Sequence, residues 1–335
     1  MSERDTCFMG WELKARHVEV LMNSGRLSLA AIVAGIFLYP AAAGPISYDY
    51  IQLDYPGAAD TFVYGMNDQR QVVGYYDTTS GGNVSGFFWS NGIFTSLQYP
   101  GSLATSVFGI SNDGSIAGYY ALPAGGGVYG FLYNINTSSL TVGPNGTTVR
   151  AVNNNDQVLA HVGGTHDYYI GTLGGSLVEL PKYPGASDTT YRGINSSGSA
   201  VGWYTDAGNA RHVFLYSGGT FLPISCGAST GAFGMNDSGT AALISDAGQN
   251  YLYSGGSCSA LSLPPGAEFM QVEAINNLGD FGGLLGFPGD SSTHGFIALQ
   301  TPEPAAAGLV LIGLLFGAAL WKRERNTKTR GDTGN

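Results

Sequence analysis

Short apolar runs recur along the chain between residues 48 and 300, and glycine, asparagine or serine separates each run from the next. The runs are too short for helices, and they are rich in the aromatic and β-branched residues that favour strands. The residues between them favour tight reversals of the backbone. The pattern therefore predicts an antiparallel, all-β body.

One short motif, Gly-Ile-Asn or a close variant of it, returns six times with a period near 42 residues. The six copies begin at Gly65, Gly109, Ala151, Gly193, Gly234 and Ala274. After the motif, a second run often ends in Gly-Tyr-Tyr, as at residues 74–76. A third run follows, such as residues 86–89, and a fourth closes on Tyr-Pro-Gly, as at residues 99–101. Each copy therefore predicts one antiparallel sheet of four short strands.

The period and the strand number are typical of β-propeller blades. Six copies predict a six-bladed β-propeller over residues 44–300. The last copy supplies only three strands, ending at residues 296–300, and an orphan run at residues 50–53 precedes the first copy. We therefore expect the N-terminal strand to complete the C-terminal blade and close the ring.

The net charge of the predicted propeller limits the kinds of partner that it can bind. Residues 44–300 contain seventeen acidic residues and five basic ones. Because binding to phosphate backbones needs a basic face, this balance argues against nucleic acid as a partner.

The N-terminal region, residues 1–43, has the features of a secretory signal. Arg26 precedes an apolar run at residues 27–38, and alanines 41–43 offer a cleavage site. Met22 is an alternative start of translation, because the region before it is long and polar for a signal.

Export leaves Cys226 and Cys258 in a compartment where a disulfide can persist. The repeat places Cys226 at the end of one outer strand and Cys258 at the start of the next. Since one strand is about 17–20 Å long, the two cysteines would lie at opposite faces. Cys226 and Cys258 are therefore a possible disulfide, although this layout keeps them apart unless a loop bends back.

The repeated Asn-(Asn/Asp/Ser)-x-Gly turn is the most frequent polar feature. Oxygen-rich turns can bind Ca²⁺, so calcium is an alternative here. The turn lacks the clustered carboxylates of a dedicated calcium loop, and asparagine and glycine suit tight hairpins. We therefore interpret it as structural and expect no cofactor.

Histidines and aromatic residues offer further candidates. His212 and His294 share one repeat position and could be a remnant site, but a role at the start of a strand explains them as well. His161 and His166 lack a nearby third ligand. The Gly-Tyr-Tyr aromatics could stack on sugars, although their fixed place in each blade favours packing between blades. No nucleophile elbow, phosphate loop or Cys-x-x-Cys motif is present, so we assign no catalytic residue.

The C-terminal region, residues 301–335, combines Pro302-Glu303-Pro304, an uncharged apolar segment at residues 305–320, and the basic residues Lys322, Arg323 and Arg325. A helix over the apolar segment would span a membrane with strain, and its basic end would lie in the cytoplasm. These three parts resemble the PEP-CTERM tail of bacterial exported proteins, and a plain membrane anchor is the alternative. The resemblance implies recognition of the Pro-Glu-Pro motif by an exosortase-type enzyme, removal of the helix, and a mature form at the cell surface or in the medium.

The body resembles the HAF family of extracellular repeats over residues 48–300, through His212-Val213-Phe214, His294-Gly295-Phe296 and the Gly-Ile-Asn turn followed by Val-Gly-Tyr-Tyr. This resemblance implies a surface protein and names no ligand. We therefore expect a non-catalytic interaction module of the cell surface or extracellular matrix, associated with exopolysaccharide. Two alternatives remain open: a propeller hydrolase or lyase acting on a glycan or lactone, and a structural repeat protein without a ligand.

Overall fold

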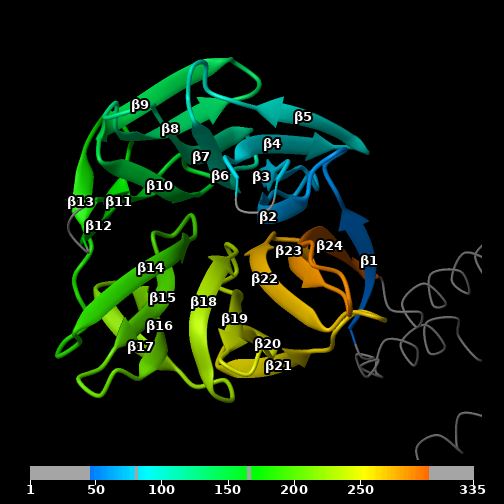
Figure 1. Ribbon diagram of the computed structural model, residues 1–335. Coiled ribbons are helices and arrows are strands. Elements are labelled where there is room, and N and C mark those ends of the chain that lie inside the picture. The colour runs from blue at the N-terminus through cyan, green and yellow to red at the C-terminus, as the bar shows by residue number, and fades with distance from the viewer. Residues whose placement is uncertain (1–45, 80–81, 164–166, 302–335) are drawn as a thin grey trace, which may run out of the picture. The chain divides into compact units, whose positions relative to one another are not determined.

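A computed structural model describes residues 46–79, 82–163 and 167–301, and every regular element in these ranges is a β-strand. Six four-stranded antiparallel sheets are arranged around a common axis (Figure 1). Blade I contains β2 (Asp60–Met66), β3 (Val72–Asp77), β4 (Ser85–Ser90) and β5 (Ile93–Leu97). Blade II contains β6 (Ala104–Ile110), β7 (Ser115–Ala121), β8 (Val128–Asn134) and β9 (Ser139–Asn145). Blade III contains β10 (Thr147–Val152), β11 (Val158–Val162), β12 (Asp167–Gly171) and β13 (Leu177–Glu179).

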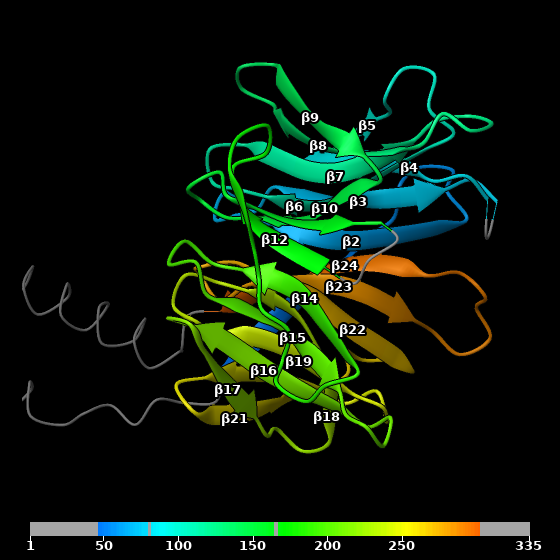
Figure 2. The same ribbon diagram turned by 90° about the vertical axis from the view of Figure 1, so that its left-hand side faces the viewer.

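The other three blades follow the same plan. Blade IV contains β14 (Asp188–Ile194), β15 (Ala200–Thr205), β16 (Arg211–Ser217) and β17 (Thr220–Ile224). Blade V contains β18 (Ser229–Met235), β19 (Ala241–Ser245), β20 (Asn250–Ser254) and β21 (Ser257–Leu261). Blade VI contains β22 (Phe269–Ile275), β23 (Phe281–Gly286), β24 (His294–Thr301) and β1 (Ser47–Leu53). The first strand of each repeat lies nearest the axis, and the side view shows the sheets packed against one another (Figures 1 and 2). The predicted six-bladed propeller is confirmed.

The ring closes through its two chain ends, as the leftover strands predicted. Blade VI has the order β1-β24-β23-β22, so the N-terminal strand is its outer strand. An ion pair also joins blades I and VI, because Arg70 Nε lies 2.9 Å from Asp280 Oδ2 and the Asp280 side chain is fully buried. No open sheet edge is left where the ends of the repeat array meet.

Each innermost strand carries a β-bulge just before its Gly-Ile-Asn turn. In blade I, for example, Val63 pairs with Gly74 and Gly65 pairs with Val73, which leaves Tyr64 as the extra residue. In four of the six blades a glycine follows the bulge and allows close packing around the axis, and in the other two the residue is alanine. A Cβ atom on Gly193 would lie 2.5 Å from the Phe233 carbonyl oxygen of the next blade. The bulge and the glycine together explain why the motif recurs in this form.

The cores lie between neighbouring blades rather than within one sheet. Val63, Val72 and Phe87 of blade I, for instance, pack with Leu53 and Ile297 of blade VI. All five are nearly or fully buried, so each blade needs its neighbour to cover its apolar face.

The tyrosine of Tyr-Pro-Gly stacks on the last tyrosine of Gly-Tyr-Tyr, or of Gly-Trp-Tyr at residues 202–204, in the following blade. The ring centroids lie 3.5 to 3.7 Å apart in the three pairs that the structure describes, which are Tyr55–Tyr76, Tyr99–Tyr120 and Tyr183–Tyr204. The prediction of packing between blades is confirmed for this last tyrosine.

The possible disulfide between Cys226 and Cys258 is present, and the argument from the repeat layout that kept them apart was wrong. They form a disulfide with a Cα–Cα distance of 5.6 Å, which joins the end of blade IV to the outer strand of blade V. Neighbouring strands rotate by roughly 20–25° each, so the outer strand lies about 60–75° from the innermost one. It therefore runs largely around the ring, and the end of one outer strand approaches the start of the next. In the chain-entropy description, a bridge across 32 residues stabilises the fold by about 3–4 kcal/mol.

Candidate functional site

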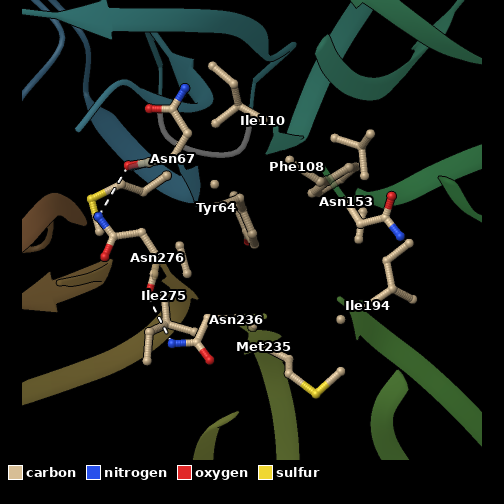
Figure 3. A pocket seen from close by; sticks show the side chains of 18 of the residues that line it. Tyr64, Asn67, Phe108, Ile110, Asn153, Ile194, Met235, Asn236, Ile275 and Asn276 are labelled. Carbon is tan, nitrogen blue, oxygen red and sulfur yellow. Dashed lines mark hydrogen bonds between the residues drawn. The ribbon is translucent and has the colours of Figure 1, made fainter. Parts of the chain in front are cut away.

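The asparagine of the repeated turn holds its own turn and also reaches the next blade. In blade VI, the Asn276 side-chain oxygen accepts hydrogen bonds from the backbone N–H groups of Leu278 and Asp280, each at 3.0 Å. Its side-chain nitrogen donates to the Asn67 carbonyl oxygen at 3.2 Å (Figure 3). Equivalent bonds between blades run from Asn67, Asn153 and Asn236 to the carbonyl oxygens of Ser111, Asn195 and Asn276.

The residue after this asparagine forms a second ring of hydrogen bonds at the same mouth of the central channel. Five backbone N–H groups donate to the side-chain oxygen at the same position of the next blade, at 2.7 to 2.9 Å. The donors are Asp68, Asn112, Ser196, Asp237 and Asn277. The Asn154 amide also crosses the mouth to Asp237 Oδ2 at 2.9 Å.

These bonds support the structural interpretation of the turn. The carboxylate oxygens of Asp68 and Asp237 accept from backbone and side-chain amides. The described residues contain no cluster of three or more His, Cys, Asp or Glu side chains able to hold a metal ion. Repetition of the asparagine therefore follows from the cross-linking of blades.

The candidate site lies next to this ring, at the six bulge positions. A cavity of about 110 Å³ is lined by the bulge residues and by the turns. The bulge residues are Tyr64, Phe108, Arg150, Arg192, Phe233 and Glu273. Figure 3 shows Tyr64 and Phe108 between the turn asparagines of the surrounding blades. Bulges commonly redirect side chains next to functional sites, and here they direct one side chain per blade to the channel.

Two guanidinium groups occupy adjacent bulge positions, and we call Arg150 and Arg192 the arginine pair. The Arg150 guanidinium carbon lies 4.9 Å from the Phe108 ring centroid. The Arg192 carbon lies 5.4 Å from the Trp203 centroid and 5.9 Å from that of Phe233. Burial, and next the repulsion from Arg192, lower the pKa of Arg150 from its ordinary value. Both side chains remain partly exposed, so solvent reaches the pair.

Glu273 is the acidic member of the bulge positions and is only 8% exposed. Burial raises the pKa of its carboxyl group to about 7, although the charge of Arg192 and a hydrogen bond from Gln271 act in the opposite direction. The carboxyl group is therefore partly protonated at neutral pH. It can then donate or accept a hydrogen bond in the channel.

Tyrosine hydroxyl groups complete the surroundings of the arginine pair. Tyr64 and the first tyrosine of Gly-Tyr-Tyr in blade I, Tyr75, share a hydrogen bond of 3.2 Å. Burial is the largest cause of a raised pKa for each of them. Both hydroxyl groups therefore stay protonated at neutral pH. One of them donates to the other, so one proton of the two remains for another acceptor.

The histidines that the sequence singled out are not brought together. His212 Nε2 pairs with Asp206 Oδ2 at 2.9 Å within blade IV. His294 lies between Asp54 at 2.9 Å and Asp290 at 3.1 Å in blade VI. Each histidine stands at or next to the first residue of the third strand of its repeat, which supports its interpretation as a repeat position. His161 packs on the Tyr168 ring, and His166 lies outside the described residues.

Both predicted targeting segments lie outside the described residues. These are the signal region 1–43 and the sorting residues Pro302, Glu303, Pro304, Lys322, Arg323 and Arg325. Among the residues that are described, no helix is long and apolar enough to cross a membrane.

Sequence reasoning missed the bulge residues, although a signal for them exists. They all stand immediately before the Gly-Ile-Asn-like motif, three residues before its third position. This position changes from aromatic to basic to acidic among the copies, while the neighbouring positions stay nearly constant. Variation inside an otherwise regular repeat indicates a position that the fold leaves free for function.

Comparison with known proteins identifies no family for this chain. No protein-family model and no curated protein matches the chain. Among solved structures it is similar to a virginiamycin B lyase from Staphylococcus aureus, with 14% identity over 76% of this chain and 89% of the other, at a TM-score of 0.44. It is also similar to the fucose-specific lectin from Aleuria aurantia, with 14% identity, 77% and 97% coverage, and a TM-score of 0.41. The β-propeller domain of the Trilobed protease from Pyrococcus furiosus matches with 13% identity, 70% and 82% coverage, and a TM-score of 0.45.

These structures include a lyase, a lectin and part of a protease. At these identities and TM-scores, none of the likenesses assigns a function to this chain, because one fold can carry many unrelated functions.

Proposed function

We propose that the chain is an exported, non-catalytic interaction module of the cell surface or extracellular matrix, sorted by an exosortase-type enzyme and associated with exopolysaccharide. The observation that carries this proposal is the position of the last strand. β24 ends at Thr301, and the Pro-Glu-Pro motif begins at the next residue. Cleavage at the motif would therefore release a propeller with all of its strands.

The disulfide gives independent support for export. Cys226 and Cys258 are bonded, and such bonds persist mainly in oxidising compartments outside the cytosol. The sequence-based expectations of a signal region and a sorting tail agree with that location.

Intact-mass spectrometry of protein recovered from the producing cells and their medium tests the proposal. We expect the native protein to end near Thr301 and to be lost from the surface in a variant that lacks residues 302–325. A matched variant in which only Pro302 and Pro304 are changed to alanine should retain the tail and stay in the membrane fraction. A native mass that includes the apolar segment would indicate a plain anchor and contradict sorting.

A second candidate function is a hydrolase or lyase acting on a glycan or lactone in the channel. Glu273 favours it, because a buried carboxyl group with a pKa raised to about 7 is suited to general acid–base catalysis. Turnover of such a substrate that is lost in Glu273→Gln would favour this candidate over the binding module.

A further inference from the structure

The arginine pair differs from the other basic residues of the propeller in its surroundings. The propeller contains only five basic residues. Arg70 and Lys182 form ion pairs with carboxylates, and Arg211 is exposed. The remaining two, Arg150 and Arg192, lie side by side in the channel, and neither forms an ion pair with a described residue. Two cations are thus partly desolvated together, and the neighbouring aromatic rings and Glu273 offset only part of the cost.

Each guanidinium carries five N–H donors, and within the part of the chain that the structure describes neither group donates a hydrogen bond to another residue. The guanidinium carbon of Arg150 lies over the Phe108 ring, and that of Arg192 lies over the rings of Trp203 and Phe233. A partly buried guanidinium group whose donors lack partners is costly unless something else satisfies it.

The acidic groups of the cavity leave the pair available. Asp68 and Asp237 lie at the asparagine mouth, where amide groups already bond their oxygens. Glu273 is partly protonated at neutral pH, so it compensates less than one of the two positive charges. The level of the arginine pair therefore has an excess of positive charge, which favours an anionic ligand.

We infer that the arginine pair is a binding site for a small organic carboxylate inside the propeller channel. A planar carboxylate matches the fork of guanidinium donors. Phe108 and Phe233 line the same cavity and can pack against a short carbon skeleton. The cavity of about 110 Å³ has room for a ligand of a few non-hydrogen atoms. This inference rests on the proposed role as a binding module, but not on export or sorting.

Isothermal titration calorimetry at low ionic strength and pH 6 tests the site on the full chain. Acetate and lactate are the probes, acetamide is the neutral isostere of acetate, and sulfate is the competing oxyanion. We expect saturable binding of both carboxylates, no binding of acetamide and weaker binding of sulfate. Arg150→Met and Arg192→Met should each weaken acetate binding about tenfold or more, because each removes a charged hydrogen-bond partner.

Lys182→Met is the matched control, because it removes the same charge from an exposed position away from the cavity. It should bind acetate like the wild type. Arg150→Lys keeps the positive charge but loses the planar fork of guanidinium N–H donors, so it should bind acetate with intermediate affinity. It replaces Arg150→Met in the test if that variant fails to fold. Melting curves establish that each variant is folded.

Three results would overturn the inference: folded wild type that binds neither carboxylate, arginine variants that bind like Lys182→Met, or sulfate that binds more tightly than both carboxylates. None of them affects the sorting proposal. Chemical conversion of a bound probe, followed by proton NMR, would instead contradict the non-catalytic role while leaving the site in place.

Discussion

At the scale of single residues, burial of the ionisable carboxyl group of Glu273 costs free energy of folding, and the rest of the propeller offsets this cost. Folding moves its carboxyl group from water into the channel, where burial opposes ionisation despite the charge of Arg192. Gln271 donates a hydrogen bond to this carboxyl group, and the charge of Glu273 contributes to the raised pKa values of Tyr64 and Tyr75. The bulge on β22 therefore holds an acid whose protonation state depends on pH near neutrality.

This burial predicts a dependence of stability on pH. The pKa of Glu273 is about 7 in the folded protein, whereas an ordinary glutamate titrates near 4.3. Between these values the folded state binds more protons than the unfolded state, so stability falls as pH rises from about 4.5 to about 7. Glu273→Gln should flatten this part of the profile and be more stable than the wild type above pH 7, by up to about 3–4 kcal/mol.

Thermal unfolding of the wild type and Glu273→Gln between pH 4.5 and 8 measures this difference. Glu268→Gln is the control, because Glu268 is exposed in the same blade, and its profile should run parallel to that of the wild type. Parallel profiles for Glu273→Gln as well would show that Glu273 titrates like an exposed acid.

At this scale, the sequence does not show which residues meet in the channel. Arg150 and Arg192 are isolated basic residues in the linear sequence, and no local pattern shows that they line one cavity. Their convergence depends on bulges in two separate strands and on closure of the ring. Only the three-dimensional register supplies that information.

At the scale of the element, the innermost strand and its turn act as one unit that cross-links two blades. Asn276 satisfies two N–H groups of its own turn and the Asn67 carbonyl group of blade I. These groups are buried or partly buried, so their loss leaves polar atoms without partners.

Asn276→Ala should therefore destabilise the protein by about 2–4 kcal/mol, because one side chain satisfies several buried groups. Chemical denaturation monitored by tryptophan fluorescence measures the change. Asn83→Ala, at an exposed asparagine between β3 and β4, should change stability by less than about 0.5 kcal/mol. Equal effects of the two substitutions would mean that the turn bonds contribute little.

The strands were predictable because their sequence pattern is local and repeated. Short apolar runs separated by turn residues, together with the Gly-Ile-Asn turn, predicted the strands and their grouping into sheets. The Cys226–Cys258 bond was not predictable in this way. It depends on how strongly each sheet twists from its inner to its outer strand, which the strand pattern does not encode.

At the scale of the whole molecule, stability depends on closing the ring, because the cores lie between blades. Leu53 on β1 is 4% exposed and packs with residues of blades VI and I. Tyr48 and Tyr50 on the same strand pack against the core between blades V and VI. The N-terminal strand therefore contributes to both interfaces of the blade that it completes.

A variant that lacks Ser47–Leu53 should lose this closure. Its β24 becomes an exposed edge strand, and the apolar faces on both sides of blade VI lose contacts. We expect a melting temperature lowered by several degrees and concentration-dependent association, because open edges pair with other chains. Differential scanning fluorimetry and analytical ultracentrifugation measure the two effects.

Adding a synthetic peptide with the sequence of residues 46–57 to the truncated protein tests whether β1 closes the ring. If β1 acts as a closing strand, the peptide should restore the melting temperature and the monomeric state of the truncated protein, as an added strand does at an open sheet edge. A peptide of the same composition in scrambled order should not. A truncated protein that is already as stable and monomeric as the intact one would show that blades I–V and three strands of blade VI suffice, and that the ring does not depend on its N-terminal strand.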